Sequence, residues 1–171
     1  MSRVRPWLVI AGLLLVLGAA NYNIWKKEQV LDSGRQVMLE LRPVDPRSLM
    51  QGDYMMLRYS TDTFPDEDAI KSLSRKGTIV LSVDASGVGK FARLDDDTTL
   101  AGEDMRLQYK YVLGSGELRL GAESYFFQEG QAEVYANAKY GVLRVDESGA
   151  SILVGLADEN RQIIVPPPAG P

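Results

Sequence analysis

The chain has 171 residues, with 19 lysines and arginines, 23 aspartates and glutamates, and neither cysteine nor histidine. These absences exclude disulfides, thiolate or imidazole metal sites, cysteine nucleophiles and Ser-His-Asp triads. Four basic residues flank an apolar N-terminal run, and the rest of the chain holds 15 basic against 23 acidic residues. Because contacts with phosphate need clustered lysine and arginine, we expect no binding to nucleic acid.

The apolar run begins at Trp7 and continues to Trp25, interrupted only by two asparagines near its end. At ~1.5 Å per residue it spans roughly 28 Å, close to the hydrocarbon thickness of a bilayer. A tryptophan at each end fits the two interfacial aromatic belts. The run therefore predicts a transmembrane helix over residues 6–25, in contact with membrane lipid.

The flanking charges predict how this helix is oriented. Arg3 and Arg5 precede it, which favours a cytoplasmic tail of residues 1–5. Lys26 and Lys27 follow it and weaken the bias, but the adjacent Glu28 and the short tail still favour this orientation. We expect a single-pass protein of the bacterial inner membrane with its domain outside the cytoplasm.

A cleaved signal peptide is the alternative interpretation of the same run. Small residues at Gly18 and Ala20 fit a cleavage site before Asn21. Cleavage there would leave Trp25 without its interfacial role, which argues for an uncleaved anchor. Either interpretation exports the domain.

The remaining chain divides into a polar juxtamembrane linker at 26–35, a domain at 36–165 and a proline-rich tail at 166–171. Alternating apolar and polar residues and glycine turns predict many short strands. The predicted strands cover 36–42, 54–59, 78–83, 90–94, 105–113, 118–120, 142–145, 151–156 and an edge strand at 161–165. Two short helices are expected, at 65–77 and 131–139. We expect a mainly β domain, a β-rich α+β barrel or sandwich with two short helices behind one transmembrane helix.

Residues 52–59 read G-D-Y-M-M-L-R-Y. They fit the pattern GDYXXLXY at all five specified positions, and the stretches 43–51, 123–130 and 140–156 also match. The chain thus resembles the GDYXXLXY family of bacterial membrane-anchored proteins. That family has no known biochemical function and is often encoded beside multi-pass membrane proteins. The resemblance therefore implies an anchor and a multi-pass membrane partner, but no reaction.

The motif has two physical interpretations. Gly52 permits a positive φ, Asp53 can bond its own backbone, and Leu57 and Tyr59 are expected in the core, which makes a register-setting turn. Alternatively, Asp53, Tyr54 and Arg58 form a recognition surface. The candidate recognition residues are Gly52, Asp53, Tyr54, Leu57, Arg58, Tyr59, Glu123 and Glu129.

Catalytic sites are weakly indicated. Residues 47–57 resemble a stretch of type I signal peptidases, but Val44 stands at the position of the serine nucleophile, and Ser48 has no lysine at a suggestive spacing. Glu123 and Glu129 flank an aromatic run and could form an acid–base pair, although such acids more often cap turns. The acidic loop at 95–104 offers oxygen ligands suitable for Ca²⁺ but lacks the EF-hand spacing, which favours a solvated loop.

These patterns favour a non-catalytic accessory or binding module of the cell envelope, acting with an integral membrane partner. The alternative is an envelope hydrolase using carboxylate or Ser-Lys chemistry, with a signal-peptidase-like fold that lacks the signal-peptidase nucleophile. We expect no cofactor and no metal.

Overall fold

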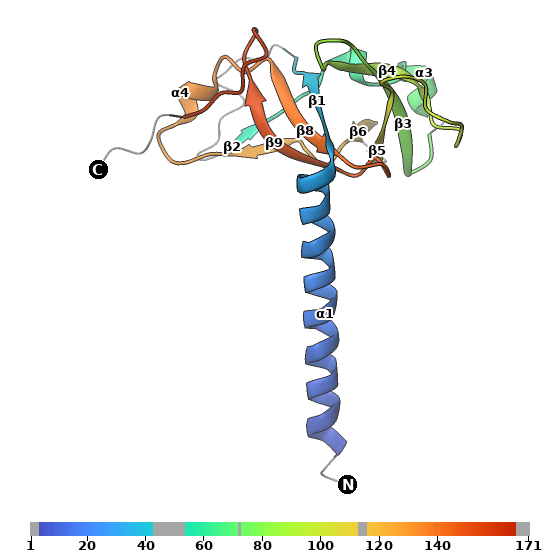
Figure 1. Ribbon diagram of the computed structural model, residues 1–171, viewed down its shortest axis with the longest axis vertical. Helices are drawn as coiled ribbons and strands as arrows, with labels where there is room; N and C mark the ends of the chain where they lie inside the picture. The colour runs from blue at the N-terminus through green and yellow to red at the C-terminus, as the bar shows by residue number, and fades with distance from the viewer. Residues whose placement is uncertain (1–3, 43–53, 72, 113–115, 167–171) are drawn as a thin grey trace.

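The computed structural model describes residues 4–42, 54–71, 73–112 and 116–166. A β-rich domain stands at one end of a long helix, α1, which runs from Val4 to Ser33 (Figure 1). Over Trp7–Ser33 this helix is long and apolar enough to cross a membrane. The prediction of an N-terminal apolar helix ahead of a β-rich domain is confirmed.

The strands form three antiparallel groups. The first sheet has the order β1-β8-β9, with β1 at Arg35–Glu40, β8 at Tyr140–Val145 and β9 at Ser151–Ala157. The second has the order β4-β3-β5-β6, with β3 at Lys76–Val83, β4 at Gly89–Leu94, β5 at Met105–Val112 and β6 at Glu117–Arg119. The third is a pair of β2, Tyr54–Met56, with β7, Ser124–Phe126.

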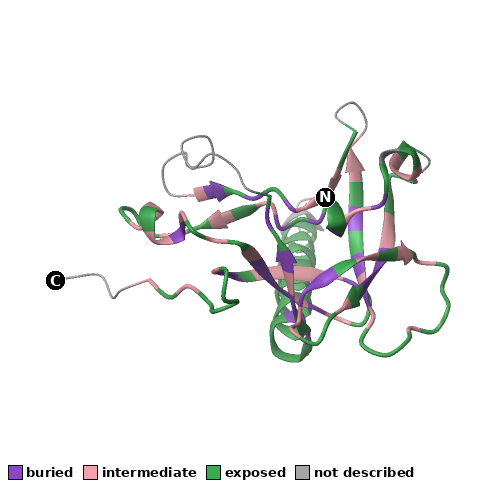
Figure 2. Cartoon of the chain, turned by 90° about the horizontal axis from the view of Figure 1, so that it is seen from above, coloured by how far each residue is buried: buried purple, intermediate pink, exposed green. Residues whose placement is uncertain are grey.

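Two contacts curl the larger sheets around one core. The amide of Met38 in β1 donates to the carbonyl of Gly87, beside β4, at 2.9 Å. On the other side the amide of Gln108 in β5 donates to the carbonyl of Gly149, in the β8–β9 turn, at 2.8 Å. The result is a curled half-barrel whose inward side chains are buried, as the purple strand segments show (Figure 2). Its fully buried residues include Val37, Leu39, Ile79, Leu81, Leu107, Leu143 and Leu156.

Both expected helices are present but shorter than expected. They are α3 at Glu67–Lys71 and α4 at Ala132–Tyr135. A 3-10 turn, η1, adds Thr61–Thr63. Gly77 does not end the first helix, because it lies within β3 beneath a tyrosine ring. A Cβ added there would come within 2.5 Å of the hydroxyl of Tyr109.

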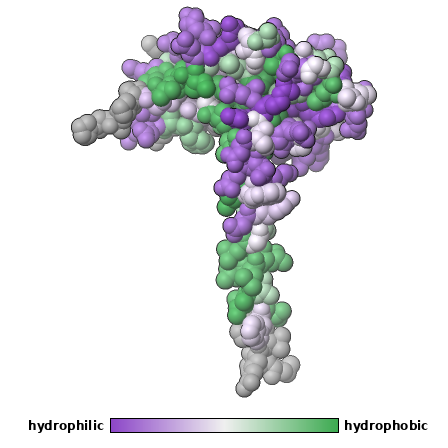
Figure 3. All heavy atoms as spheres, in the orientation of Figure 1, coloured by the Kyte–Doolittle hydropathy of each residue, from purple (hydrophilic) through white to green (hydrophobic). Residues whose placement is uncertain are grey.

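Residues 26–33, expected as a polar linker, continue α1 instead. The helix is hydrophobic in its lower part and becomes hydrophilic where it meets the domain (Figure 3). Val30 is only 3% exposed, in a stretch of helix that otherwise faces solvent. The amide of Gly34 donates to the carbonyl of Val30 at 3.0 Å, and the Arg144 guanidinium donates to the carbonyl of Gly34 at 2.9 Å. The helix therefore passes directly into β1.

Three further segments differ from the predictions. The strand expected at 54–59 is regular only over Tyr54–Met56, and Tyr59 then makes one bridge with Leu41. The edge strand expected at 161–165 is a single bridge between Ile163 and Ala157. The strand β7 was not predicted, because three residues are too few to give a periodic signal.

Candidate functional site

The inner face of the motif segment belongs to the core. Along residues 54–59 buried and more exposed residues alternate, and Met55, Leu57 and Tyr59 are the buried ones. The predicted core assignment of Leu57 and Tyr59 is confirmed. Gly52 and Asp53 lie outside the described residues, as does Ser48.

Tyr59 fixes this segment to the start of β7. Its hydroxyl donates to the carbonyl of Ala122 at 2.6 Å in a buried environment. Burial raises the pKa of Tyr59 well above its ordinary value, and the negative charge of Glu123 raises it further. The hydroxyl therefore stays neutral and acts as a structural donor.

Glu123 shapes the same turn. Its carboxylate accepts hydrogen bonds from the amides of Leu120 and Gly121, the second at 3.1 Å. Its own carbonyl accepts from the amide of Leu57 at 2.8 Å. Glu129 is exposed, before α4. Of the two proposed acid–base partners, Glu123 thus serves as a turn cap.

The outer face of the β2–β7 hairpin is apolar and open to solvent. We define it by Tyr54, Met56, Arg58 and Phe126. Tyr54 pairs with Phe126 across the strands, and their ring centroids lie 5.7 Å apart. Phe126 is 73% exposed and Met56 49% exposed. Arg58 continues the alternation on this side and is also exposed. Within the described parts of the chain, no carboxylate forms an ion pair with it.

Packing on the opposite side shows where this outer face points. Tyr125 and Phe127 both contact the ring of Tyr135 in α4, with centroids 5.1 and 5.4 Å away. Because successive side chains of a strand alternate, Phe126 points away from α4. In Figure 1, α4 lies farther from α1 than the hairpin does. The outer face is therefore turned away from α4.

The sequence placed Tyr54, Met56 and Arg58 on one face but missed Phe126 as an exposed member of it. The signal for Phe126 is the run Tyr125-Phe126-Phe127, which is too apolar to show an alternation. Only the pairing of β7 with β2, about 70 residues away in the chain, brings it beside Tyr54.

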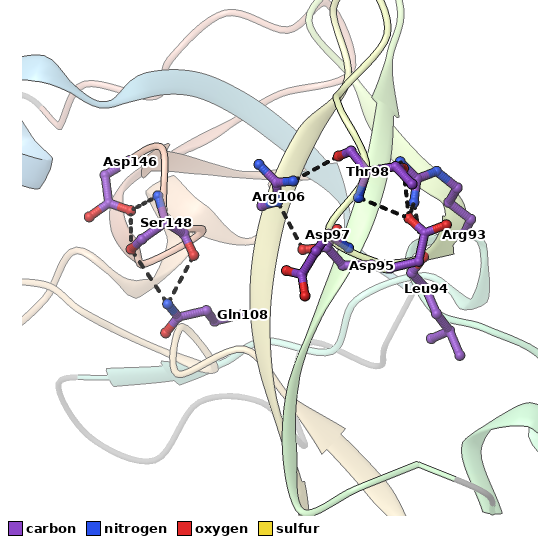
Figure 4. A network of polar contacts seen from close by, with 10 residues as sticks. Arg93, Leu94, Asp95, Asp97, Thr98, Arg106, Gln108, Asp146 and Ser148 are labelled. Atoms are coloured by element: carbon purple, nitrogen blue, oxygen red, sulfur yellow. Dashed lines mark hydrogen bonds and ion pairs between the residues drawn. The ribbon is translucent and has the colours of Figure 1, made fainter.

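A cleft of about 610 Å³ lies between the start of β1, the loop before β5 and the β8–β9 turn. Its lining includes Arg35, Asp97, Asp104, Arg106, Asp146 and Glu147. Arg106 Nε lies 2.8 Å from an oxygen of Asp95, and its guanidinium also donates to the carbonyl of Thr98 (Figure 4). Arg35 pairs with Glu103. Both arginines of the cleft are thus already neutralised.

In the acidic loop considered for Ca²⁺, the carboxylates of Asp95 and Asp96 already bind donors of the protein itself. Asp96 pairs with Arg93, and hydrogen bonds from Thr98 lower the pKa of its carboxyl group. Asp95 is held by Arg106. Among the described residues, no group of three or more carboxylates is arranged to hold a metal ion.

Comparison with known proteins gives one match. No curated protein and no solved structure matches the chain. The family model described as "GDYXXLXY protein" matches residues 16–156, most of the chain, including the last part of the apolar run, the motif and strands β1 to β8. The chain therefore belongs to the GDYXXLXY protein family.

Proposed function

We propose that this protein is a membrane-anchored, non-catalytic accessory module of the bacterial cell envelope, acting with an integral membrane partner. In this proposal α1 crosses the inner membrane with its N-terminus in the cytoplasm, and the domain lies outside the cytoplasm. The basic residues before the apolar run support this orientation.

The observation that carries the proposal is the joint between α1 and the domain. Val30 is buried, and Gly34 is held by Val30 and Arg144, so the helix runs into β1 without an irregular linker. Trp25 and Ser33 are eight residues apart, or about 12 Å along a helix. The domain is thereby held close to the bilayer, where the extracytoplasmic loops of a membrane partner lie.

The polar groups of the domain support a non-catalytic role. Tyr59 and Glu123 hold a turn, Arg106 and Asp95 hold a loop, and Lys71 and Lys90 pair with surface acids. These groups serve the structure of the domain itself.

The test is purification of tagged full-length protein in mild detergent, with mass spectrometry of what accompanies it. The comparison is a variant with a flexible eight-residue glycine-serine insertion after Lys27, which keeps the anchor and frees the domain. We expect one integral membrane protein to accompany the wild type in a fixed ratio and to be depleted with the variant. Wild-type protein that purifies alone, or equal recovery from both, would contradict the proposal.

A further inference from the structure

We propose that the outer face of the β2–β7 hairpin docks an extracytoplasmic segment of the membrane partner that carries an apolar side chain beside a carboxylate. This inference rests on the proposed function, because it assumes that such a partner exists. It adds the surface used and the chemistry recognised.

The apolar part of the surface can bind an apolar side chain without rearranging. The paired rings of Tyr54 and Phe126 and the neighbouring Met56 side chain lie on one face of a two-stranded ribbon. The inner face of that ribbon is held by Met55 and Tyr125, both packed in or against the core. Aromatic side chains on a fixed backbone lose little entropy on binding, which is why they dominate interface energies.

Arg58 gives the surface its charge preference. It extends the same face, and no carboxylate of the described chain forms an ion pair with it. After residue 27 the chain carries eight more acidic than basic residues, so a guanidinium without an ion pair among the described residues contrasts with its surroundings. A guanidinium on the same face as two aromatic rings matches a segment that carries both a carboxylate and an apolar side chain.

The position of the face selects the source of this segment. Because α1 is fixed to the domain at Val30 and Gly34, the hairpin is held with the rest of the domain at a set distance from the end of the apolar run. The domain end of α1 lies about 12 Å beyond Trp25 along the helix, and the headgroup layer is roughly 5–8 Å thick. The loops of a membrane protein occupy this level. An anionic lipid surface is disfavoured, because the domain itself is acidic.

The experiment places the photo-crosslinking residue benzoylphenylalanine at single positions of the full-length protein in intact cells. Positions 126 and 56 probe the proposed surface, and Leu94 and Val154, exposed on β4 and β9, are the matched controls. We expect positions 126 and 56 to capture the same integral membrane protein and the controls to capture little of it. Arg58→Glu should lower the yield at position 126 about tenfold, while Arg58→Lys should retain part of it. Lys110→Glu, an equal charge change on exposed β5, should leave the yield unchanged.

Melting curves for every variant establish that a lost crosslink is not a lost fold. Crosslinks to lipid alone, or to a second copy of this chain, would overturn the inference. Capture of a membrane protein from positions 94 or 154 but not 126 would overturn the surface and leave the proposed function standing. No protein captured at any position, together with a wild-type protein that purifies alone, would overturn both.

Discussion

Tyr59 belongs both to the apolar core and to the polar network that holds the motif. Its ring is buried among core side chains, and its hydroxyl donates to the carbonyl of Ala122. That carbonyl lies at the turn capped by Glu123, which in turn accepts from Leu57 through its backbone. The last tyrosine of the motif thus joins the motif strand to the segment that leads into β7.

Replacing Tyr59 by phenylalanine should change both stability and its dependence on pH. The lost hydrogen bond and the unsatisfied carbonyl should lower the free energy of unfolding by about 1–3 kcal/mol. Burial raises the pKa of Tyr59 in the folded state above its unfolded value of about 10. Its contribution is therefore complete below about pH 10 and is lost as pH rises toward the folded-state pKa, since the unfolded chain ionises first. Urea unfolding at pH 8 and pH 10.5 checks both effects.

In the wild type, stability should fall between these two pH values, and in Tyr59→Phe it should fall less. Tyr125 is expected to leave a remainder, because burial and then the hydrogen bond with Tyr135 raise its pKa to about 12. An identical pH dependence in the two proteins would contradict the role given to Tyr59.

Leu57 and Arg58 are neighbours, but truncation to alanine should cost much more stability at Leu57 than at Arg58. Leu57→Ala opens a cavity in the core and should cost roughly 2–5 kcal/mol, because Leu57 is only 4% exposed. Arg58→Ala removes an exposed side chain and should change stability by less than about 0.5 kcal/mol. Denaturant unfolding of both variants is the measurement. Equal losses would show that the two faces of this strand are assigned wrongly.

For the described motif residues 54–59, the sequence predicted the face on which each one lies, because the two-residue period is a local property. It did not predict which distant residues the motif residues contact. Ala122 lies 63 residues from Tyr59, and Phe126 reaches Tyr54 only through strand pairing. Of the named recognition residues, Leu57 and Tyr59 are core, Glu123 caps a turn, and Arg58 with Tyr54 lies on an exposed face.

At the scale of elements, the composition of residues 26–33 did not predict that α1 continues as a helix up to the domain. The residues after Trp25 are mostly polar, and nothing local separates a loop from a solvated helix there. The helix persists because Val30 is buried where it meets the domain and Gly34 closes its last turn. Tertiary burial at one position thus decides the structure of an otherwise solvent-exposed segment.

Gly34→Ala should loosen this joint. A Cβ at Gly34 would lie 2.3 Å from the carbonyl oxygen of Val30 and 3.1 Å from the amide nitrogen of Val145. Both are backbone atoms, so the helix end or β1 must move, at about 1–3 kcal/mol. Thermal unfolding in detergent should show the loss. Gly18→Ala, at a site with open space around the added methyl group, is the control and should be neutral.

The two hairpin turns with the pattern D-x-S-G are a second element-scale feature. Asp84 and Asp146 each accept from the amide and hydroxyl of the serine two residues later. Gly87 and Gly149 follow with φ of +81° and +84°. The sequence predicted both hairpins, because their turn chemistry is local.

These glycines should differ when each is replaced by alanine. Both substitutions place a Cβ on a residue with positive φ, which should lower the free energy of unfolding by about 1 kcal/mol or more. At Gly149 the added Cβ would also lie 3.1 Å from the backbone of Arg106 in β5, whereas at Gly87 its nearest neighbour is the flexible end of Met38 at 3.9 Å. Gly149→Ala should therefore lower the unfolding free energy more than Gly87→Ala. Equal losses would mean that the β8–β9 turn does not press on β5.

At the scale of the whole molecule, the fold closes through contacts distant in sequence. Strand periodicity and turn residues predicted a mainly β domain behind an apolar helix. The closure depends on β1 meeting the start of β4 and on Gly149 meeting Gln108, and neither contact leaves a local signal. The outer face of the hairpin depends on the pairing of β2 with β7, which is also distant in sequence, so the sequence identified the motif without predicting the full surface.

The orientation of the whole chain can be tested directly. The apolar run offers one membrane crossing, so the two ends of the protein should lie on opposite sides of the inner membrane. Arg3 and Arg5 favour a cytoplasmic N-terminus, and positive charge retained inside is the main determinant of orientation. Alkaline phosphatase fused after Val165 should therefore be active, and green fluorescent protein exported in unfolded form and fused there should be dark. Val165 is 78% exposed and follows β9, so the fusion point lies on the surface of the described domain.

A charge-reversal variant supplies the control for this topology test. Changing both Arg3 and Arg5 to glutamate leaves Lys26 and Lys27 as the positive flank of the helix, which should invert part of the population. Phosphatase activity should then fall and fluorescence should appear. A bright wild-type fluorescent fusion with an inactive phosphatase fusion would place the domain in the cytoplasm. The extracytoplasmic docking surface would then be excluded, because Phe126 and Arg58 would face the wrong side of the membrane.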